Sequence, residues 1–124
     1  MEKPTFRQAV ESGDVEAMVA TFAEDAVLHS PITFVPFEGR EAIARLIRIL
    51  AEVLEDFHYT DQLNAEDGTV GLVFRAHVGE KKVEGLDLLR FNDEGQIRDF
   101  TVMIRPRSAT EALLAVVAPR LATG

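Results

Sequence analysis

In the segment VEGLDLLRF, between Val83 and Phe91, the carboxylate of Asp87 stands among apolar neighbours. The segment is typical of a β-strand, whose side chains alternate between two faces, so Asp87 shares a face with Val83, Gly85, Leu89 and Phe91. A carboxyl group in apolar surroundings has a raised pKa, and it can donate a hydrogen bond or take up a proton near neutral pH. Asp87 is therefore the first candidate for a catalytic group. The alternative is a structural acid satisfied by the backbone or by water.

Two polar residues, His29 and Ser30, precede Pro31 at the end of a short predicted strand. An imidazole beside a cavity can act as an acid or a base, and a serine hydroxyl can hydrogen-bond a ligand. Strand alternation puts Leu28 and Ser30 on one face and His29 on the other. Ser30 has no evident base and lacks the Gly-x-Ser-x-Gly motif of hydrolase nucleophiles. Both remain secondary catalytic candidates, and a structural or surface role is the alternative for His29.

Tyr59 and Asp61 share one face of a predicted strand over 57–63. An inward orientation would bring a phenol and a carboxylate into the interior, whereas an outward one gives an ordinary polar rim. We favour the outward orientation. We expect neither a metal nor another cofactor, because the three histidines lie on separate predicted strands and no glycine-rich phosphate loop is present.

Several aromatic and apolar residues could line a pocket for a small hydrophobic molecule. The alternative is a filled aromatic core, since aromatic side chains dominate both kinds of interior. The candidate ligand-binding residues are Phe6, Phe22, Leu72, Phe74, Phe100 and Val102.

The composition is that of a soluble globular protein, with 47% apolar and 27% charged residues in a chain of 124, enough for one domain. A formal net charge of -8 argues against binding to nucleic acid or anionic membranes, which require a basic patch. The absence of cysteine excludes disulfides and thiolate chemistry and fits a reducing compartment. The N-terminal residues are polar and show no hydrophobic signal region, so we expect a cytoplasmic protein.

The periodicity of apolar residues predicts helices first and a run of strands afterwards. Helices are expected from Pro4 up to Gly13, from the N-cap Asp14 through Phe22 to about residue 24, over 40–56, and from a capping box at 108–111 to a frayed end near Pro119. Strands are expected over 26–30, 57–63, 70–78, 83–91 and 97–105, with a loop or edge segment over 32–39. This order is typical of the α+β class, here a cone-shaped, curved antiparallel sheet wrapped around helices. The apolar interior of such a cone is a common ligand site.

Each long strand has a more apolar face, which we expect to look inward. The predicted inward residues are Leu72, Phe74, Ala76 and Val78, then Val83, Gly85, Asp87 and Leu89, then Phe100, Val102 and Ile104. The outer face keeps Val73, Leu86, Leu88 and Met103 beside charged residues. A half-apolar outer face is best explained by a partner, so we expect a symmetric homodimer through this face.

Three segments resemble the SnoaL-like branch of the nuclear transport factor 2-like superfamily. They are SGDVEAMVATFAEDAVLHSP over 12–31, FEGREAI over 37–43 and GLDLLRFNDEGQIRDF over 85–100. That superfamily includes ketosteroid isomerases, limonene epoxide hydrolases, polyketide cyclases and scytalone dehydratases. The resemblance spans nearly the whole chain and implies a single SnoaL-like domain over 1–124 with the cystatin-like α+β barrel. It implies little about the reaction, because sites on one fold vary freely.

Carrying over the site of ketosteroid isomerase places its general-base Asp at Ser30, its oxyanion-hole Tyr at Phe6 and its protonated Asp at Asp87. Only the last residue is kept, and in that family an apolar site holds this acid neutral so that it donates a hydrogen bond. Steroid isomerisation of that kind is therefore not expected. The Asp-Arg-Asp relay of an epoxide hydrolase would need Arg75, which we predict to point outward.

Two functions follow as expectations. The first is a small cofactor-free isomerase, cyclase or dehydratase acting on an apolar, carbonyl-bearing metabolite, with Asp87 as acid or oxyanion donor and His29 or Ser30 assisting. The second is a module that binds an apolar ligand or a protein partner without chemistry. In both, the partners are a small apolar molecule and a second copy of the chain.

Overall fold

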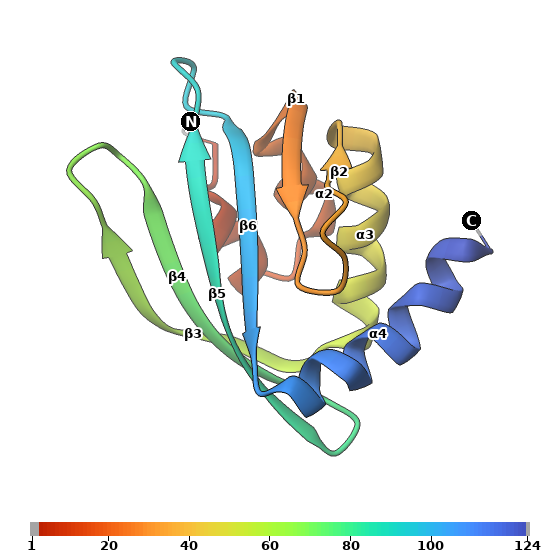
Figure 1. Cartoon of the computed structure of the whole chain (residues 1–124). Helices are drawn as coiled ribbons and strands as arrows, with labels where there is room; N and C mark the ends of the chain where they lie inside the picture. The colour runs from red at the N-terminus through yellow and green to blue at the C-terminus, as the bar shows by residue number, and fades with distance from the viewer. Residues whose placement is uncertain (1–2, 124) are drawn as a thin grey trace.

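Along the chain, two short helices, two strands and a long helix come before four strands and a last helix. Figure 1 shows these elements for residues 3–123, which the structure, a computed structural model, describes. The helices are α1 (Phe6–Glu11), α2 (Val15–Ala20), α3 (Arg40–Val53) and α4 (Arg107–Ala122). The strands are β1 (Phe22–His29), β2 (Phe37–Glu38), β3 (Glu55–Asn64), β4 (Val70–Val78), β5 (Lys81–Phe91) and β6 (Ile97–Arg105). Within these residues, no helix is long and apolar enough to cross a membrane.

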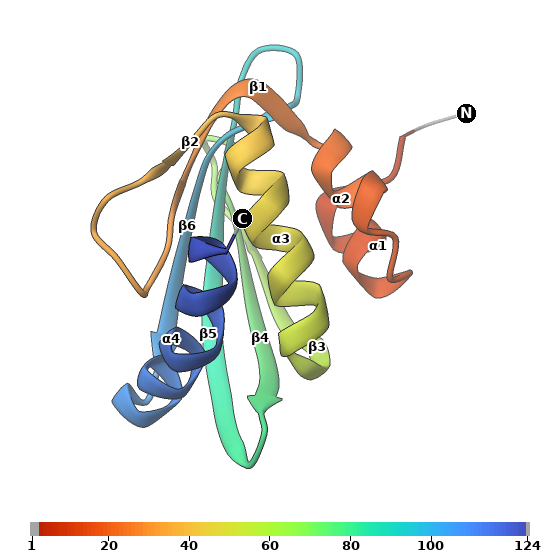
Figure 2. The ribbon, with the colours of Figure 1, turned by 90° about the vertical axis from the view of Figure 1, so that its right-hand side faces the viewer.

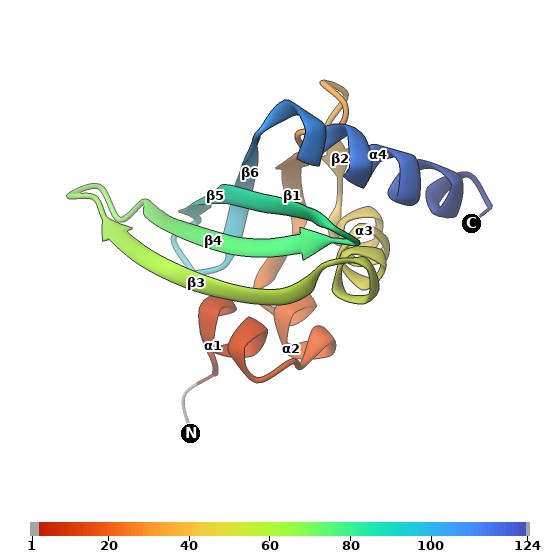
Figure 3. The same cartoon turned by 90° about the horizontal axis from the view of Figure 1, so that it is seen from below.

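The strands form one sheet in the order β2-β1-β6-β5-β4-β3. Seen from below, the sheet is curved, and α1 and α2 lie beneath it (Figure 3). Figure 2 shows α3 running alongside the sheet. The predicted α+β class, a curved sheet around helices, is confirmed. The sheet is mixed and not wholly antiparallel, because β1 pairs with β6 in parallel. β1 reaches this place from the N-terminal helices and not through a hairpin, so no tight turn reverses its direction.

The two N-terminal helices are defined by local side-chain caps. The Thr5 hydroxyl accepts a hydrogen bond from the backbone N–H of Gln8 at 3.1 Å, and the Gln8 side chain accepts one from the N–H of Thr5 at 2.9 Å. Pro4 therefore precedes the cap, and the prediction that the first helix begins at Pro4 is wrong. Gly13 adopts φ +71° between the helices, and Asp14 caps α2 as predicted.

The predicted second helix is too long, because α2 ends at Ala20 and Phe22 begins β1. Phe22 pairs with Ile97 of β6, and its ring packs 5.8 Å from that of Phe6 and 5.5 Å from that of Phe100, between centroids. The apolar residues from Val15 to Phe22 do recur at helical spacing in the sequence. Tertiary packing in this aromatic cluster overrides it.

Three helix ends also differ from expectation. α3 ends at Val53 and not at residue 56, since β3 already begins at Glu55. α4 begins after Pro106 without a side-chain cap, so the predicted capping box at 108–111 is wrong. Pro119 does not fray the end but lies inside α4, which continues to Ala122.

The predicted inward faces of β4, β5 and β6 do form the core. Leu72, Phe74, Val83, Leu89 and Phe100 are all buried. Gly85 has a specific place in this layer, because a Cβ built on it would lie 2.2 Å from the Phe74 ring and 2.8 Å from the carbonyl oxygen of Met103. The ring of Phe74 can lie across β5 only because residue 85 has no side chain.

We predict that Gly85→Ala lowers the free energy of unfolding by about 1–3 kcal/mol, the usual cost of overpacking a core. Urea unfolding measures the change. Gly71→Ala on β4 is the matched control, since a Cβ there meets its nearest neighbour at an ordinary 3.6 Å. Equal effects of the two substitutions would contradict the close packing of Phe74 on Gly85.

Candidate active site

A cavity of about 610 Å³ lies between the sheet and the helices. Apolar side chains make up most of its lining, which takes residues from α1, α2, α3 and α4 and from every strand from β3 to β6. Two uncharged polar residues, Ser30 and Tyr59, and one buried acid, Asp87, also line it. The cavity therefore has a few polar groups in a largely apolar wall, as ligand sites commonly do.

Asp87 lies in the middle of β5, between Leu72 of β4 and Val102 of β6. It is only 5% exposed. Burial raises the pKa of Asp87 to about 8, because the charged form loses its hydration, and the Tyr59 hydroxyl offsets a small part of that rise. At neutral pH the carboxyl is therefore mostly protonated, while its ionised form remains accessible.

Tyr59 points into the cavity, so the outward orientation that we favoured is wrong. The reason is a β-bulge: Tyr59 pairs with Phe74 and Asp61 with Val73, which leaves Thr60 as an extra residue between them. The extra residue breaks the alternation, so Tyr59 is buried while Asp61 is exposed and accepts a hydrogen bond from the Thr60 hydroxyl at 2.9 Å.

The Tyr59 hydroxyl is buried and has no hydrogen-bond partner among residues 3–123. Desolvation raises the pKa of this phenol, and the nearby charge of Asp87 raises it further, so it stays protonated. The phenol and the Asp87 carboxyl thus affect each other's pKa without a hydrogen bond of normal geometry. A buried hydroxyl without a partner can donate a hydrogen bond to an oxygen atom of a ligand.

Two groups of aromatic side chains form part of the wall. Phe57 stacks on Phe74 at 4.7 Å and meets Tyr59 edge-on at 5.2 Å, which fixes the phenol ring. Phe6 and Phe100 pack together at 5.1 Å in the second group. Of the predicted ligand-binding residues, Phe6, Phe74, Phe100 and Val102 line the cavity, whereas Phe22 and Leu72 lie behind it in the core.

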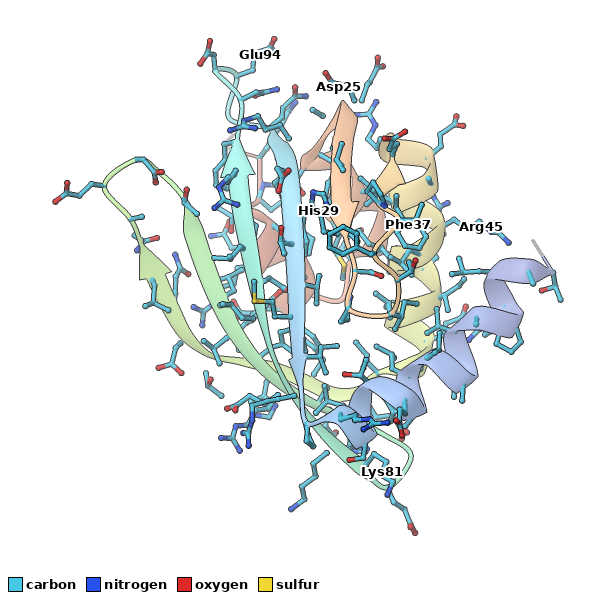
Figure 4. The ribbon with its side chains drawn as sticks, viewed as in Figure 1. Asp25, His29, Phe37, Arg45, Lys81 and Glu94 are labelled. Atoms are coloured by element: carbon cyan, nitrogen blue, oxygen red, sulfur yellow. The ribbon has the colours of Figure 1, made fainter. Side chains whose placement is uncertain are left out.

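Ser30 and His29 face opposite ways, as strand alternation predicts. Ser30 lines the cavity, and its hydroxyl accepts a hydrogen bond from the N–H of Ile32 at 3.3 Å. His29 lies on the outer face near the end of β1, where its Nε2 is 3.3 Å from a carboxylate oxygen of Asp99 (Figure 4). The structure therefore brings Ser30 to the same cavity as Asp87 but does not bring His29 there.

The phenol at this site comes from a different element than the resemblance implies. Phe6 of α1 lines the cavity but has no polar group, and Tyr59 of β3 brings the only tyrosine of the chain beside Asp87. The one sequence feature that singles out Tyr59 is that the chain has no other tyrosine. The bulge at Thr60 leaves no mark in the pattern of apolar residues. Among residues 3–123, no group of three or more His, Asp or Glu residues could hold a metal ion.

Comparison with solved structures gives clear matches. A structure described as a steroid delta-isomerase from Pseudomonas aeruginosa is 37% identical, with a TM-score of 0.87 over 93% of this chain and 85% of that one. An uncharacterised protein with a cystatin-like fold from Silicibacter pomeroyi is 29% identical, with a TM-score of 0.88 over 95% and 83%. An epoxide hydrolase/cyclase-like enzyme, SalBIII, involved in pyran ring formation in the polyether salinomycin, is 21% identical over 84% and 87%; its TM-score of 0.69 shows a shared fold.

Comparison with curated proteins gives no match. The family model for the SnoaL-like domain matches residues 5–100, which contain both aromatic groups and Asp87. The fold described above and this match agree with the resemblance seen in the sequence. The chain therefore belongs to the SnoaL-like domain family, within the nuclear transport factor 2-like superfamily.

Proposed function

We propose that this protein is a cofactor-free enzyme that moves a proton within a small, apolar, carbonyl-bearing metabolite. The observation that supports this most is the carboxyl of Asp87, buried in an apolar cavity with a pKa of about 8. General acid–base catalysis is most efficient when the catalytic pKa is near the working pH, and burial gives Asp87 such a value. A structural acid needs no such cavity beside it.

The chemistry can be written with two groups. The ionised carboxylate of Asp87 takes a proton from the carbon next to the carbonyl group, and the electron pair of that C–H bond moves toward the carbonyl oxygen. The Tyr59 hydroxyl donates a hydrogen bond to the enolate oxygen that forms, and it can do so because it has no other partner. The protonated Asp87 then returns the proton to another carbon of the conjugated enolate. The double bond has moved and the enzyme is unchanged.

A relative supports this class of reaction. The 37%-identical structure is described as a steroid delta-isomerase, and an isomerase needs no net reactant beyond its substrate. In this chain the two positions that the resemblance gives to a base and a phenol are Ser30 and Phe6. We therefore assign the phenol to Tyr59 and both proton-transfer steps to Asp87, while Ser30 can hydrogen-bond a second oxygen of the ligand.

A ligand-binding module without catalysis is the second candidate. It is favoured by one observation: Asp87 is the only buried carboxyl among residues 3–123, so no separate base accompanies it. If the carboxyl stays protonated throughout, Asp87 and Tyr59 only donate hydrogen bonds to a bound carbonyl group. The two candidates differ in whether a bound ketone exchanges its carbon-bound protons.

We predict that the protein converts β,γ-unsaturated cyclic ketones to their conjugated isomers. The probes are 3-cyclohexen-1-one and a steroidal ketone of the same type, followed by ultraviolet absorbance and by NMR detection of deuterium uptake. The steroidal ketone is included because Asp87 and Tyr59 would replace the base and the phenol that the resemblance places at Ser30 and Phe6. Asp87→Asn should lower the rate at least about 100-fold, because the acid–base group is lost. Tyr59→Phe should lower it by about 100-fold or more, because the enolate loses its hydrogen-bond donor.

Asp99→Asn is the control, since it replaces the same type of side chain at a position that pairs with His29 on the outer face. It should leave the rate within about twofold of the wild type, as expected for a surface residue. Binding of either ketone with no deuterium uptake would reject the enzyme and leave the binding module.

The ionisation of Asp87 is also coupled to folding. Its pKa is about 8 in the folded protein and ordinarily 3.8, so between these values the folded state retains a proton that the unfolded chain has lost. The free energy of unfolding should therefore fall as pH rises through this window and level off above it. Asp87→Asn removes the coupling, and its stability relative to the wild type should rise by up to about 1.4 kcal/mol per pH unit.

Urea unfolding of both proteins across a series of pH values tests this. Parallel curves for the wild type and Asp87→Asn would show that the carboxyl is not held protonated by burial. Asp61→Asn, at an exposed position of β3, serves as the control and should follow the wild type.

We further propose that two copies of the chain associate through the outer sheet face. Val73, Leu86 and Met103 form an apolar row across β4, β5 and β6. Beside this row, Glu84 bridges two arginines: its carboxylate lies 3.0 Å from Arg75 and 2.8 Å from Arg105. A two-fold interface pairs a surface with itself, so charged groups around its apolar centre can pair across the interface where both signs are present, as here.

Light scattering after size exclusion should then show a dimer at micromolar concentration. Met103→Arg should shift it to a monomer, since a charge would be buried without a partner. Leu114→Arg on α4, at another exposed apolar position, should leave the dimer intact. A monomeric wild type would reject this assembly, and the proposal for the cavity would be unaffected.

A further inference from the structure

The cavity has a charged mouth between α2 and α3. The lining residues that are exposed are Gly13, Glu16, Arg48, Ala51 and Glu52, whereas the others are half-buried or buried. All five come from α2, the turn before it and the second half of α3, two helices that lie against each other (Figure 2). These side chains therefore form the most exposed edge of the cavity, which we call its mouth.

Arg48 is the only cationic side chain of the lining among residues 3–123. Its Nη2 lies 3.1 Å from Oε1 of Glu16, so an ion pair joins α3 to α2 across the mouth. The second acid at the mouth, Glu52, is paired with Arg120 of α4. The positive charge of Arg48 is thus already matched before any ligand arrives.

An anionic ligand finds little to attract it in this arrangement. The mouth contributes two carboxylates and one guanidinium to the lining, and the only titratable groups farther in are Tyr59 and Asp87. Neither can supply a positive charge. A carboxylate moved inward would lose its hydration without a free counter-ion, which is costly, whereas a neutral ring with one oxygen would not.

We infer that Glu16 is a specificity-determining residue: by holding Arg48 in an ion pair at the mouth, it makes the cavity select neutral apolar ligands over anionic ones of the same shape. This inference rests on the proposed function for the use of the cavity and narrows its ligand to uncharged molecules. It also predicts that freeing Arg48 relaxes the selection, because a guanidinium without a partner can pair with a carboxylate.

The test compares 2-naphthol, which is neutral at neutral pH, with 2-naphthoate, which has the same rings and a negative charge. Calorimetry should show that the wild type binds 2-naphthol at least about tenfold more tightly, a modest difference for one buried charge. Glu16→Gln should strengthen binding of 2-naphthoate about threefold, as expected for an exposed ion pair, and leave 2-naphthol unchanged. Adding Arg48→Gln to that variant should remove the gain.

Glu24→Gln is the matched control, because it changes the net charge equally. Glu24 is 89% exposed, pairs with Arg40 at 3.4 Å and does not line the cavity. Equal binding of the two probes by the wild type, or the same gain in Glu24→Gln, would overturn the inference while the cavity remains a ligand site. If neither probe binds, the cavity is not used for such ligands, and the inference falls with the proposed function.

Discussion

The structure depends on keeping one carboxyl group, that of Asp87, out of water without a counter-ion. An isolated charge in such a place is costly, so the group keeps its proton up to a pKa of about 8. The curved sheet, the helices packed against it and the two aromatic groups exclude water from this position. The wall of the cavity therefore contains a carboxyl group that can lose or gain its proton near neutral pH.

Small departures from regular strand geometry position the partners of that carboxyl. The bulge at Thr60 turns the Tyr59 ring inward, where it meets Phe57 edge-on. The missing side chain at Gly85 lets Phe74 lie across β5, and Phe74 in turn stacks on Phe57. The phenol is therefore held by a chain of contacts that begins with a glycine two residues from Asp87. The same contacts therefore form part of the core and position the residues of the candidate site.

The sequence predicted the fold class, the inward faces and the burial of Asp87, because each depends on alternation or periodicity that the chain keeps over long stretches. The opposite orientations of Ser30 and His29 follow from the same alternation. Tyr59 was assigned to the outer face together with Asp61, because the inserted residue that separates their orientations leaves no trace in composition. Phe22 was misplaced because its packing against Phe6 and Phe100 is a contact between distant segments, which helical spacing cannot report.

Tyr59 has a practical consequence for this chain, which contains no tryptophan and no second tyrosine. The tyrosine absorption band and most of the intrinsic emission of the native protein therefore arise from a single phenol in the wall of the cavity. A ligand that contacts this ring should change the tyrosine spectrum, so binding can be followed without any label.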